Sequence, residues 1–274
     1  MAVRGKLAGA AASRREVVRR ASELLPALRA RARRAEELRH LPDETVADLR
    51  RTELLRLANP DRYGGLGLDY DTVLEVTIEL GRACGSTAWC YSVWSSHNWL
   101  IGLYPEEAQE EYFGPSPDVL CSSAFNAALG RAEPTDGGYL LSGHWDLSSG
   151  CDVASWAILA AVTPDQGPGL FLVPRSAYQI VDTWYASGLK GTGSKDIVME
   201  PTFVPSHRLL SYATMATGHC PGRALHDRPS YRLPVFAILP FTIASPLIGI
   251  AQGAVDAYEE RLRERIERAG DSLP

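Results

Sequence analysis

The feature of this 274-residue sequence that most limits its fold is the order of its hydrophobic patterns. In residues 14–113 apolar side chains recur every three or four positions, which predicts amphipathic helices. Residues 119–209 instead form short β-type runs separated by glycine, proline and aspartate, which predicts a compact β domain. After a loop at 211–234, residues 243–269 predict one long helix. Helical, β and helical parts are therefore expected in that order.

The limits of the predicted elements follow from their apolar faces and flanking residues. In the first helix, which starts near Arg14, Val17, Ala21 and Leu28 share one face, while arginine and glutamate fill the other. The stretch 59–68 contains a proline and three glycines, which indicates turns. Further helices are expected at about 42–52, 70–83, 86–102 and 105–112, and strands near 138–145, 157–162, 169–174, 178–181 and 196–200.

Composition narrows the functional classes. A net charge of −5 gives no support to a nucleic-acid-binding surface. The five cysteines are odd in number and form no C-x-x-C pair, so we expect free thiols in a reducing, cytoplasmic environment. The Ala-rich stretch Leu7–Ala12 is too short for a secretory signal. Residues 236–251 contain Pro240 and Pro246, which favours a buried helix over a membrane span.

Three segments carry a resemblance to a known family. Residues 137–152 (GGYLLSGHWDLSSGCD) resemble the β-domain flavin segment of phenol-type flavin hydroxylases. Residues 188–194 (GLKGTGS), followed by Phe203-Val-Pro205, are similar to a Gly-Leu-Arg-Gly stretch and a strand end of the wider superfamily. Residues 249–256 (GIAQGAVD) resemble the first helix of its C-terminal bundle. The chain thus resembles the acyl-CoA dehydrogenase superfamily and, within it, the oxygenase components of two-component flavin-dependent monooxygenases.

The resemblance implies an α+β multidomain fold of the acyl-CoA dehydrogenase type. Residues 1–114 would form the N-terminal helical domain and residues 115–212 the middle β-barrel or sandwich domain. Residues 213–274 would form a loop and the first helix of a truncated C-terminal helical domain. Whatever the remaining helices of that bundle supply, including the carboxylate base of the dehydrogenases, is expected to be missing.

The implied activity is hydroxylation of a phenolic or polyketide-like aromatic ring. The resemblance implies reduced FMN or FAD as cofactor, O2 as co-substrate and a C4a-hydroperoxyflavin as the oxygen donor. The expected partners are a flavin reductase that supplies the reduced flavin by diffusion, a small aromatic substrate, and further copies of the chain in a dimer or tetramer. No metal site is expected, because the histidines show no metal-ligand spacing.

The resemblance also suggests which residues carry the chemistry. His97 would face the substrate phenol and accept its proton, since an imidazole has an ordinary pKa of about 6.5. Trp145 would lie against the isoalloxazine ring, with the hydroxyls of Ser148 and Ser149 near its N5 atom, and Ser149 would take part in catalysis. The alternative is structural: His97 could equally be a core residue with satisfied nitrogens, and Trp145 could be a strand-end core residue followed by a turn at the serines.

Further cofactor contacts are expected from the β domain and from the last helix. Ser122 and Ser123 would lie beside the flavin, and Thr192 and Ser194 would contact its phosphate or ribityl chain. Arg265 would reach the flavin pyrophosphate of a neighbouring subunit. An ordinary tight turn would explain Thr192 and Ser194, and a solvated charged helix end would explain Arg265 equally well.

Two other functions remain open from the sequence. One keeps the fold but changes the reaction to dehydrogenation of an acyl-CoA or acyl-carrier thioester, although no carboxylate occupies a recognisable base position. The other is a truncated, non-catalytic subunit of a flavoprotein assembly. The sequence contains no G-x-S-x-G, P-loop or H-E-x-x-H motif that would point to a different enzyme class.

Overall fold

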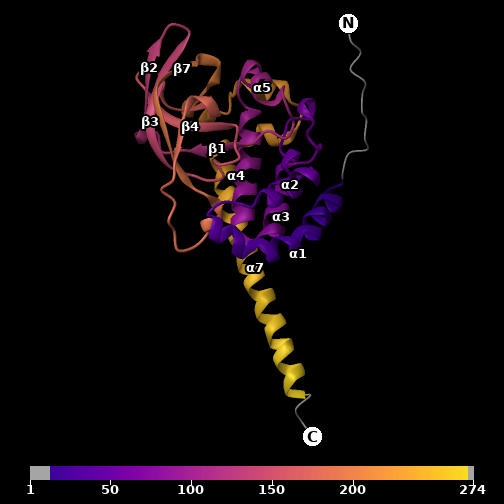
Figure 1. Cartoon of the computed structure of the whole chain (residues 1–274). Helices are drawn as coiled ribbons and strands as arrows, with labels where there is room; N and C mark the ends of the chain where they lie inside the picture. Colours follow the sequence, from indigo (N-terminus) through magenta and orange to yellow (C-terminus); the bar gives the residue numbers. More distant parts are fainter. Residues whose placement is uncertain (1–12, 271–274) are drawn as a thin grey trace.

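The computed structural model describes residues 13–270, so the Leu7–Ala12 stretch lies outside the described residues. The predicted order of helical, β and helical parts is confirmed (Figure 1). The helices are α1 (Arg14–Leu38), α2 (Asp43–Arg51), α3 (Tyr70–Gly81), α4 (Gly85–Ile101), α5 (Glu106–Phe113), α6 (Tyr212–Thr217) and α7 (Val235–Gly270). The strands are β1 (Cys121–Ala124), β2 (Gly130–Thr135), β3 (Gly138–Ser148), β4 (Trp156–Thr163), β5 (Gly167–Pro174), β6 (Gln179–Val181), β7 (Lys195–Pro205) and β8 (Leu209–Ser211).

The eight strands form one sheet with the order β6-β7-β3-β2-β4-β5-β8, and β1 pairs in parallel with β4. Helix α4 lies between this sheet and the other N-terminal helices (Figure 1). Nearly every residue of α4 is buried. A helix that is covered on all sides has no solvent-facing side, which explains why α4 lacks a face of charged residues. The molecule therefore places one face of a central helix directly beside the sheet.

Strand β3 contains an irregularity that shapes its end. Trp145 pairs with Ile197 of β7 and Ser148 pairs with Lys195, so β3 holds one extra residue between these pairs. Within this bulge Leu147 adopts a left-handed backbone conformation, with φ of 60°. The bulge breaks the alternation of inward and outward side chains at the end of the strand.

Helix α7 begins earlier than expected, at Val235 instead of at about residue 243. Pro240 and Pro246 lie inside the helix. A proline has no N–H, so Pro246 leaves the carbonyl of Thr242 without its usual helical donor. The hydroxyl of Ser92 on α4 donates to this carbonyl at 2.8 Å. A contact between distant segments thus stabilises a proline-containing helix.

We expect Ser92→Ala to destabilise the fold by about 1–3 kcal/mol, because it leaves the buried Thr242 carbonyl without a donor. Denaturant unfolding measures this change. In a Pro246→Ala background the helix regains its own N–H donor to Thr242, and the cost of Ser92→Ala should shrink towards zero. An equal cost in both backgrounds would show that the hydroxyl stabilises the protein in some other way.

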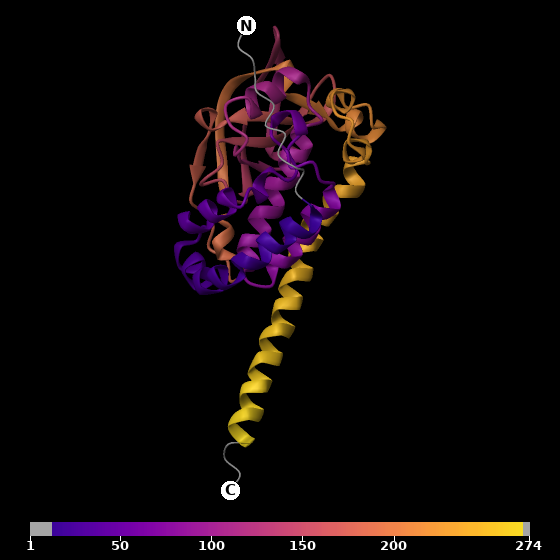
Figure 2. The same cartoon turned by 90° about the vertical axis from the view of Figure 1, so that its right-hand side faces the viewer.

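The expectation that α7 is buried is met only in part. Its first half packs against α3 and α4, yet Phe241, Leu247 and Ile248 are about half exposed. The second half projects from the body in both views (Figures 1 and 2). By length and composition alone this helix could cross a membrane, and only 28% of its most apolar window is buried. A single such helix is weak evidence for a membrane span.

Candidate functional site

A cleft of about 530 Å³ lies where helix α4, the ends of β1 and β3, and the start of α7 meet. Its size falls within the usual range for small-molecule and cofactor sites. Aromatic and aliphatic side chains form most of its lining, with a few polar groups among them. The lining residues are Trp89, Val93, Ser96, His97, Ser123, Ala124, Phe125, Asn126, Asp146, Leu147, Ser149, Phe236, Leu239, Pro240, Thr242 and Ile243.

Helix α4 supplies one wall of the cleft. Trp89, Val93, Ser96 and His97 are spaced at i, i+4, i+7 and i+8, which places them on one face of the helix. The sequence prediction identified His97 but missed Trp89. The helical spacing from His97 back to Trp89 is a signal that would have found it.

His97 is held in one orientation by the main chain. Its Nδ1 lies 2.6 Å from the carbonyl oxygen of Cys121. A carbonyl only accepts, so Nδ1 carries the hydrogen and Nε2 keeps a free lone pair. Burial lowers the pKa of His97 to about 4, and the bond to the Cys121 carbonyl only partly opposes this shift. At neutral pH His97 is therefore an uncharged hydrogen-bond acceptor on the cleft wall.

This lowered pKa predicts a specific loss of stability in acid. The unfolded chain takes up a proton on His97 near pH 6.5, whereas the folded protein resists protonation until about pH 4. The stabilisation is complete above pH 6.5 and falls by up to about 3 kcal/mol as the pH drops to 4. Unfolding measured at several pH values should show this loss for the wild type but not for His97→Gln. If the free energy of unfolding fell equally with pH in both proteins, the lowered pKa of His97 would be contradicted.

The bulge in β3 divides the residues at its end between the cleft and the core. Asp146, Leu147 and Ser149 line the cleft. Ser148 is fully buried, and no hydrogen bond to its hydroxyl is found among the described residues. Of the two serines predicted near the flavin, the structure therefore brings only Ser149 together with His97.

Ser149 belongs to a chain of buried hydroxyl groups. The indole N–H of Trp89 donates to its Oγ at 2.9 Å, and its Oγ lies 2.7 Å from that of Ser194. Ser194 in turn lies 2.7 Å from the Oγ1 of Thr192, which donates to the carbonyl of Leu189 at 2.9 Å. Thr192 ends the short 3-10 helix η5 (Lys190–Thr192). Thr192 and Ser194 therefore do not line the cleft, and they are connected to it by hydrogen bonds that lead to Ser149.

The structure places Trp145 in the core of the β domain rather than on the cleft. Its side chain is fully buried, and its indole N–H donates to the carbonyl of Ala160 at 2.7 Å. The paired residues Gly130 and Gly143 lie against its ring, where a Cβ on either would come within 2.8 Å of it. The glycines leave room for the indole on the inner face of the sheet, so the proposed site does not include Trp145.

The remaining predicted residues are spread over the molecule. Ser123 lines the cleft, whereas its neighbour Ser122 is fully buried, and no hydrogen bond to its hydroxyl is found in the described part of the chain. Arg265 is exposed in the second half of α7 and does not line the cleft. Its contact with a neighbouring subunit stays a prediction. All five cysteines are free and buried.

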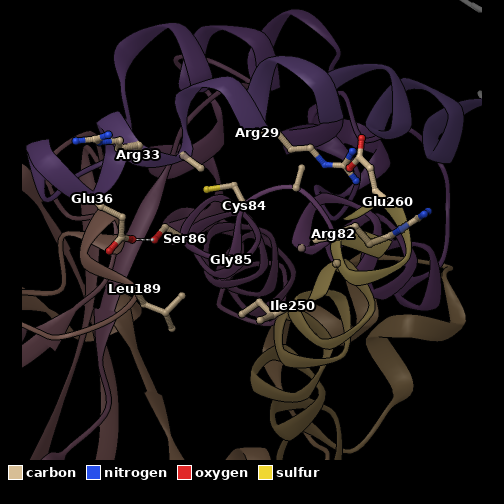
Figure 3. Close-up of a pocket in the computed structure, with 15 residues that line it drawn as sticks. Arg29, Arg33, Glu36, Arg82, Cys84, Gly85, Ser86, Leu189, Ile250 and Glu260 are labelled. Atoms are coloured by element: carbon tan, nitrogen blue, oxygen red, sulfur yellow. Dashed lines mark hydrogen bonds between the residues drawn. The ribbon is translucent and has the colours of Figure 1, made fainter. Parts of the chain in front are cut away.

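A second groove of about 560 Å³ lies between α1, the start of α4, η5 and α7 (Figure 3). Arg29, Arg33 and Arg82 line it, and Ser86 in its wall donates to Glu36 at 3.1 Å. None of the predicted catalytic or cofactor residues lines this groove. The cleft beside His97 is therefore the better candidate site, although the groove is slightly larger.

Comparisons with known proteins identify the family. A model of the N-terminal domain of acyl-CoA dehydrogenases matches residues 11–145. The chain is 40% identical over 256 residues to the oxygenase subunit HsaA of a flavin-dependent monooxygenase from Rhodococcus jostii, covering 92% of this chain and 67% of that protein. It is 37% identical to the oxygenase component of an FADH2-dependent resorcinol hydroxylase from a Rhizobium species, covering 92% of this chain and 63% of that protein. The crystal structure of HsaA from Mycobacterium tuberculosis superposes with a TM-score of 0.90 at 39% identity, covering 96% of this chain and 70% of that one.

The chain belongs to the oxygenase components of flavin-dependent monooxygenases. This confirms the resemblance and the acyl-CoA dehydrogenase-like fold predicted from the sequence. The chain spans about two thirds of the length of these oxygenase components.

The lining of the cleft suits the flavin of these oxygenase components. It offers a free lone pair on His97 Nε2 and a hydroxyl at Ser149, while Val93, Phe125 and Leu239 supply apolar walls. This combination of apolar surface and a few convergent polar groups suits a flat, partly polar ring. Within residues 13–270 no group of three or more His, Cys, Asp or Glu side chains is arranged to hold a metal ion.

Proposed function

We propose that this protein hydroxylates a phenolic or polyketide-like aromatic substrate with O2 and reduced FMN or FAD. The observation that carries the proposal is the neutral His97, whose Nε2 lone pair is free on the wall of the same cleft that Ser149 lines. The names of the relatives support the reaction class, since one is an FADH2-dependent hydroxylase of resorcinol, itself a phenolic ring. Reduced flavin, when bound, would supply the electrons and activate O2.

The residues of the cleft would prepare the substrate for oxygen transfer. His97 would accept the hydrogen of the phenol at Nε2 and so raise the electron density of the ring. A phenolate formed there would favour the protonated imidazole, which opposes the effect of burial on its pKa. The apolar side chains of Val93, Phe125 and Leu239 would keep water from the reacting atoms. Ser149 and the main chain near Ser123 would position the cofactor.

The proposal includes partners and a location. A separate flavin reductase would deliver reduced flavin, as expected for one component of a two-component enzyme. Five buried free thiols and this supply of reduced cofactor support a cytoplasmic location. The exposed apolar side chains of α7 support a homo-oligomer, either a dimer or a tetramer. Sedimentation of the purified chain would test the oligomeric state.

The proposed function is tested by supplying the chain with reduced flavin, a panel of phenols and ¹⁸O2. Mass spectrometry should find one ¹⁸O atom in a hydroxylated product. Binding of reduced flavin without any labelled product across the panel would favour the non-catalytic alternative. Reduction of bound oxidised FAD by an acyl thioester would instead favour a dehydrogenase.

A further inference from the structure

The hydroxyl chain behind Ser149 has only one consistent set of hydrogen positions. Thr192 has a single hydroxyl hydrogen, and the Leu189 carbonyl takes it because a carbonyl cannot donate. The short contact between Thr192 and Ser194 therefore requires Ser194 to donate to Thr192. By the same argument Ser149 donates to Ser194, which has no second hydrogen to offer.

This order fixes what Ser149 can present to the cleft. Its only hydrogen points to Ser194, and one of its two lone pairs accepts the indole N–H of Trp89. One lone pair remains, on a side chain that lines the cleft. Ser149 can therefore accept a hydrogen bond from a ligand in the cleft, but it cannot donate one without breaking the chain.

We propose that Thr192 and Ser194 are positioning residues that make Ser149 an obligatory hydrogen-bond acceptor and so select the reduced form of the flavin. The inference rests on the proposed function and on Ser149 facing N5 of the ring. Reduced flavin carries an N5–H donor, whereas N5 of oxidised flavin has no hydrogen and only accepts. An acceptor serine stabilises the first form and leaves N5 of the second without a partner.

Burial keeps the order of donors and acceptors in this hydroxyl chain fixed. Ser149, Ser194 and Thr192 are each less than 8% exposed, so water does not readily replace a member of the chain. The loop that holds Thr192 is fixed independently of its hydroxyl, because the Thr192 carbonyl accepts the main-chain N–H of Gly150 at 2.8 Å. A change of the side chain alone should therefore alter the hydrogen order with little change in the backbone.

The test is Thr192→Val, which keeps the shape of the side chain but removes its hydroxyl. Ser194 then loses its acceptor and becomes free to donate to Ser149, which releases the Ser149 hydrogen towards the cleft. Anaerobic titrations of the purified chain with reduced and with oxidised FMN and FAD give the ratio of the two dissociation constants. We expect Thr192→Val to lower the preference for reduced flavin by about five- to tenfold, the size of one hydrogen bond.

Two further variants separate a positioning role from a structural one. Ser194→Ala should lower the preference in the same way, and Thr192→Ser, which restores the hydroxyl, should return it to the wild-type value. A loss of affinity that is equal for both redox forms would overturn the inference and leave the proposed function intact. A wild-type chain that binds neither form would overturn both.

Discussion

Replacing His97 with asparagine should lower the rate of aromatic hydroxylation by a factor of about 10² to 10⁴, the usual range for loss of a general base. The asparagine amide nitrogen lies close to the position of Nδ1 and can still donate to the Cys121 carbonyl. The acceptor at Nε2 is lost. The variant therefore separates the catalytic atom from the bond that holds the side chain in place.

The measurement is hydroxylated product formed per O2 consumed, with reduced flavin supplied in excess. We expect O2 consumption to continue in His97→Asn while the product falls, so that the electrons are released as hydrogen peroxide. His144→Gln is the matched control, because His144 is exposed on β3, pairs with Asp196 and does not line the cleft. Unchanged hydroxylation in His97→Asn would remove His97 from the mechanism.

Gly150→Ala should destabilise the protein by about 2–4 kcal/mol. The residue has a φ of 67°, which costs an alanine about 1 kcal/mol. A Cβ at this position would also lie 2.6 Å from Nε1 of the buried Trp94 ring, and overpacking of this kind costs a further 1–3 kcal/mol, roughly. The clash would displace the segment that carries the adjacent Ser149, so flavin affinity should fall as well.

Gly137→Ala is the control for this change. Gly137 has a similar φ of 73°, but a Cβ there would meet no atom within 4 Å. It should therefore show the backbone cost alone, about 1 kcal/mol. Chemical denaturation of both variants gives the comparison. Equal losses in the two would show that Trp94 gives way and that packing behind Ser149 is loose.

The sequence predicted the architecture because the signals for it are local. The three-residue and four-residue spacing that identified the first helices depends only on neighbouring residues, and the buried positions Val17, Ala21 and Leu28 of α1 confirm it. The same kind of spacing placed His97 on α4. Where one element determines which side chains share a face, the sequence is a sufficient guide.

The end of β3 shows why the candidate site was harder to predict. In a regular strand Trp145 and Leu147 would share a face, with Ser148 on the opposite one. The extra residue in the bulge instead buries both Trp145 and Ser148 and exposes Leu147. This insertion depends on pairing with β7, about fifty residues later in the chain, and no local pattern reports it.

The prolines of α7 show a related limit of local patterns. The helix was predicted from residue 243, with Pro246 inside it, but it begins at Val235 and also includes Pro240. A proline usually interrupts a helix. The donor that compensates for Pro246, Ser92, belongs to a helix 150 residues earlier in the sequence. Long-range hydrogen bonds of this kind override local preference and cannot be inferred from one sequence without a structure.

The bond between Ser92 and the Thr242 carbonyl also bears on how ligands are chosen. Thr242 lines the cleft, and its hydroxyl lies 3.1 Å from that of Tyr70 on α3. The α7 side of the cleft is thereby tied to the helix that carries His97, and the two cannot separate without breaking buried hydrogen bonds. These bonds hold the two walls in place before a ligand arrives, so binding in the cleft costs little ordering of the protein.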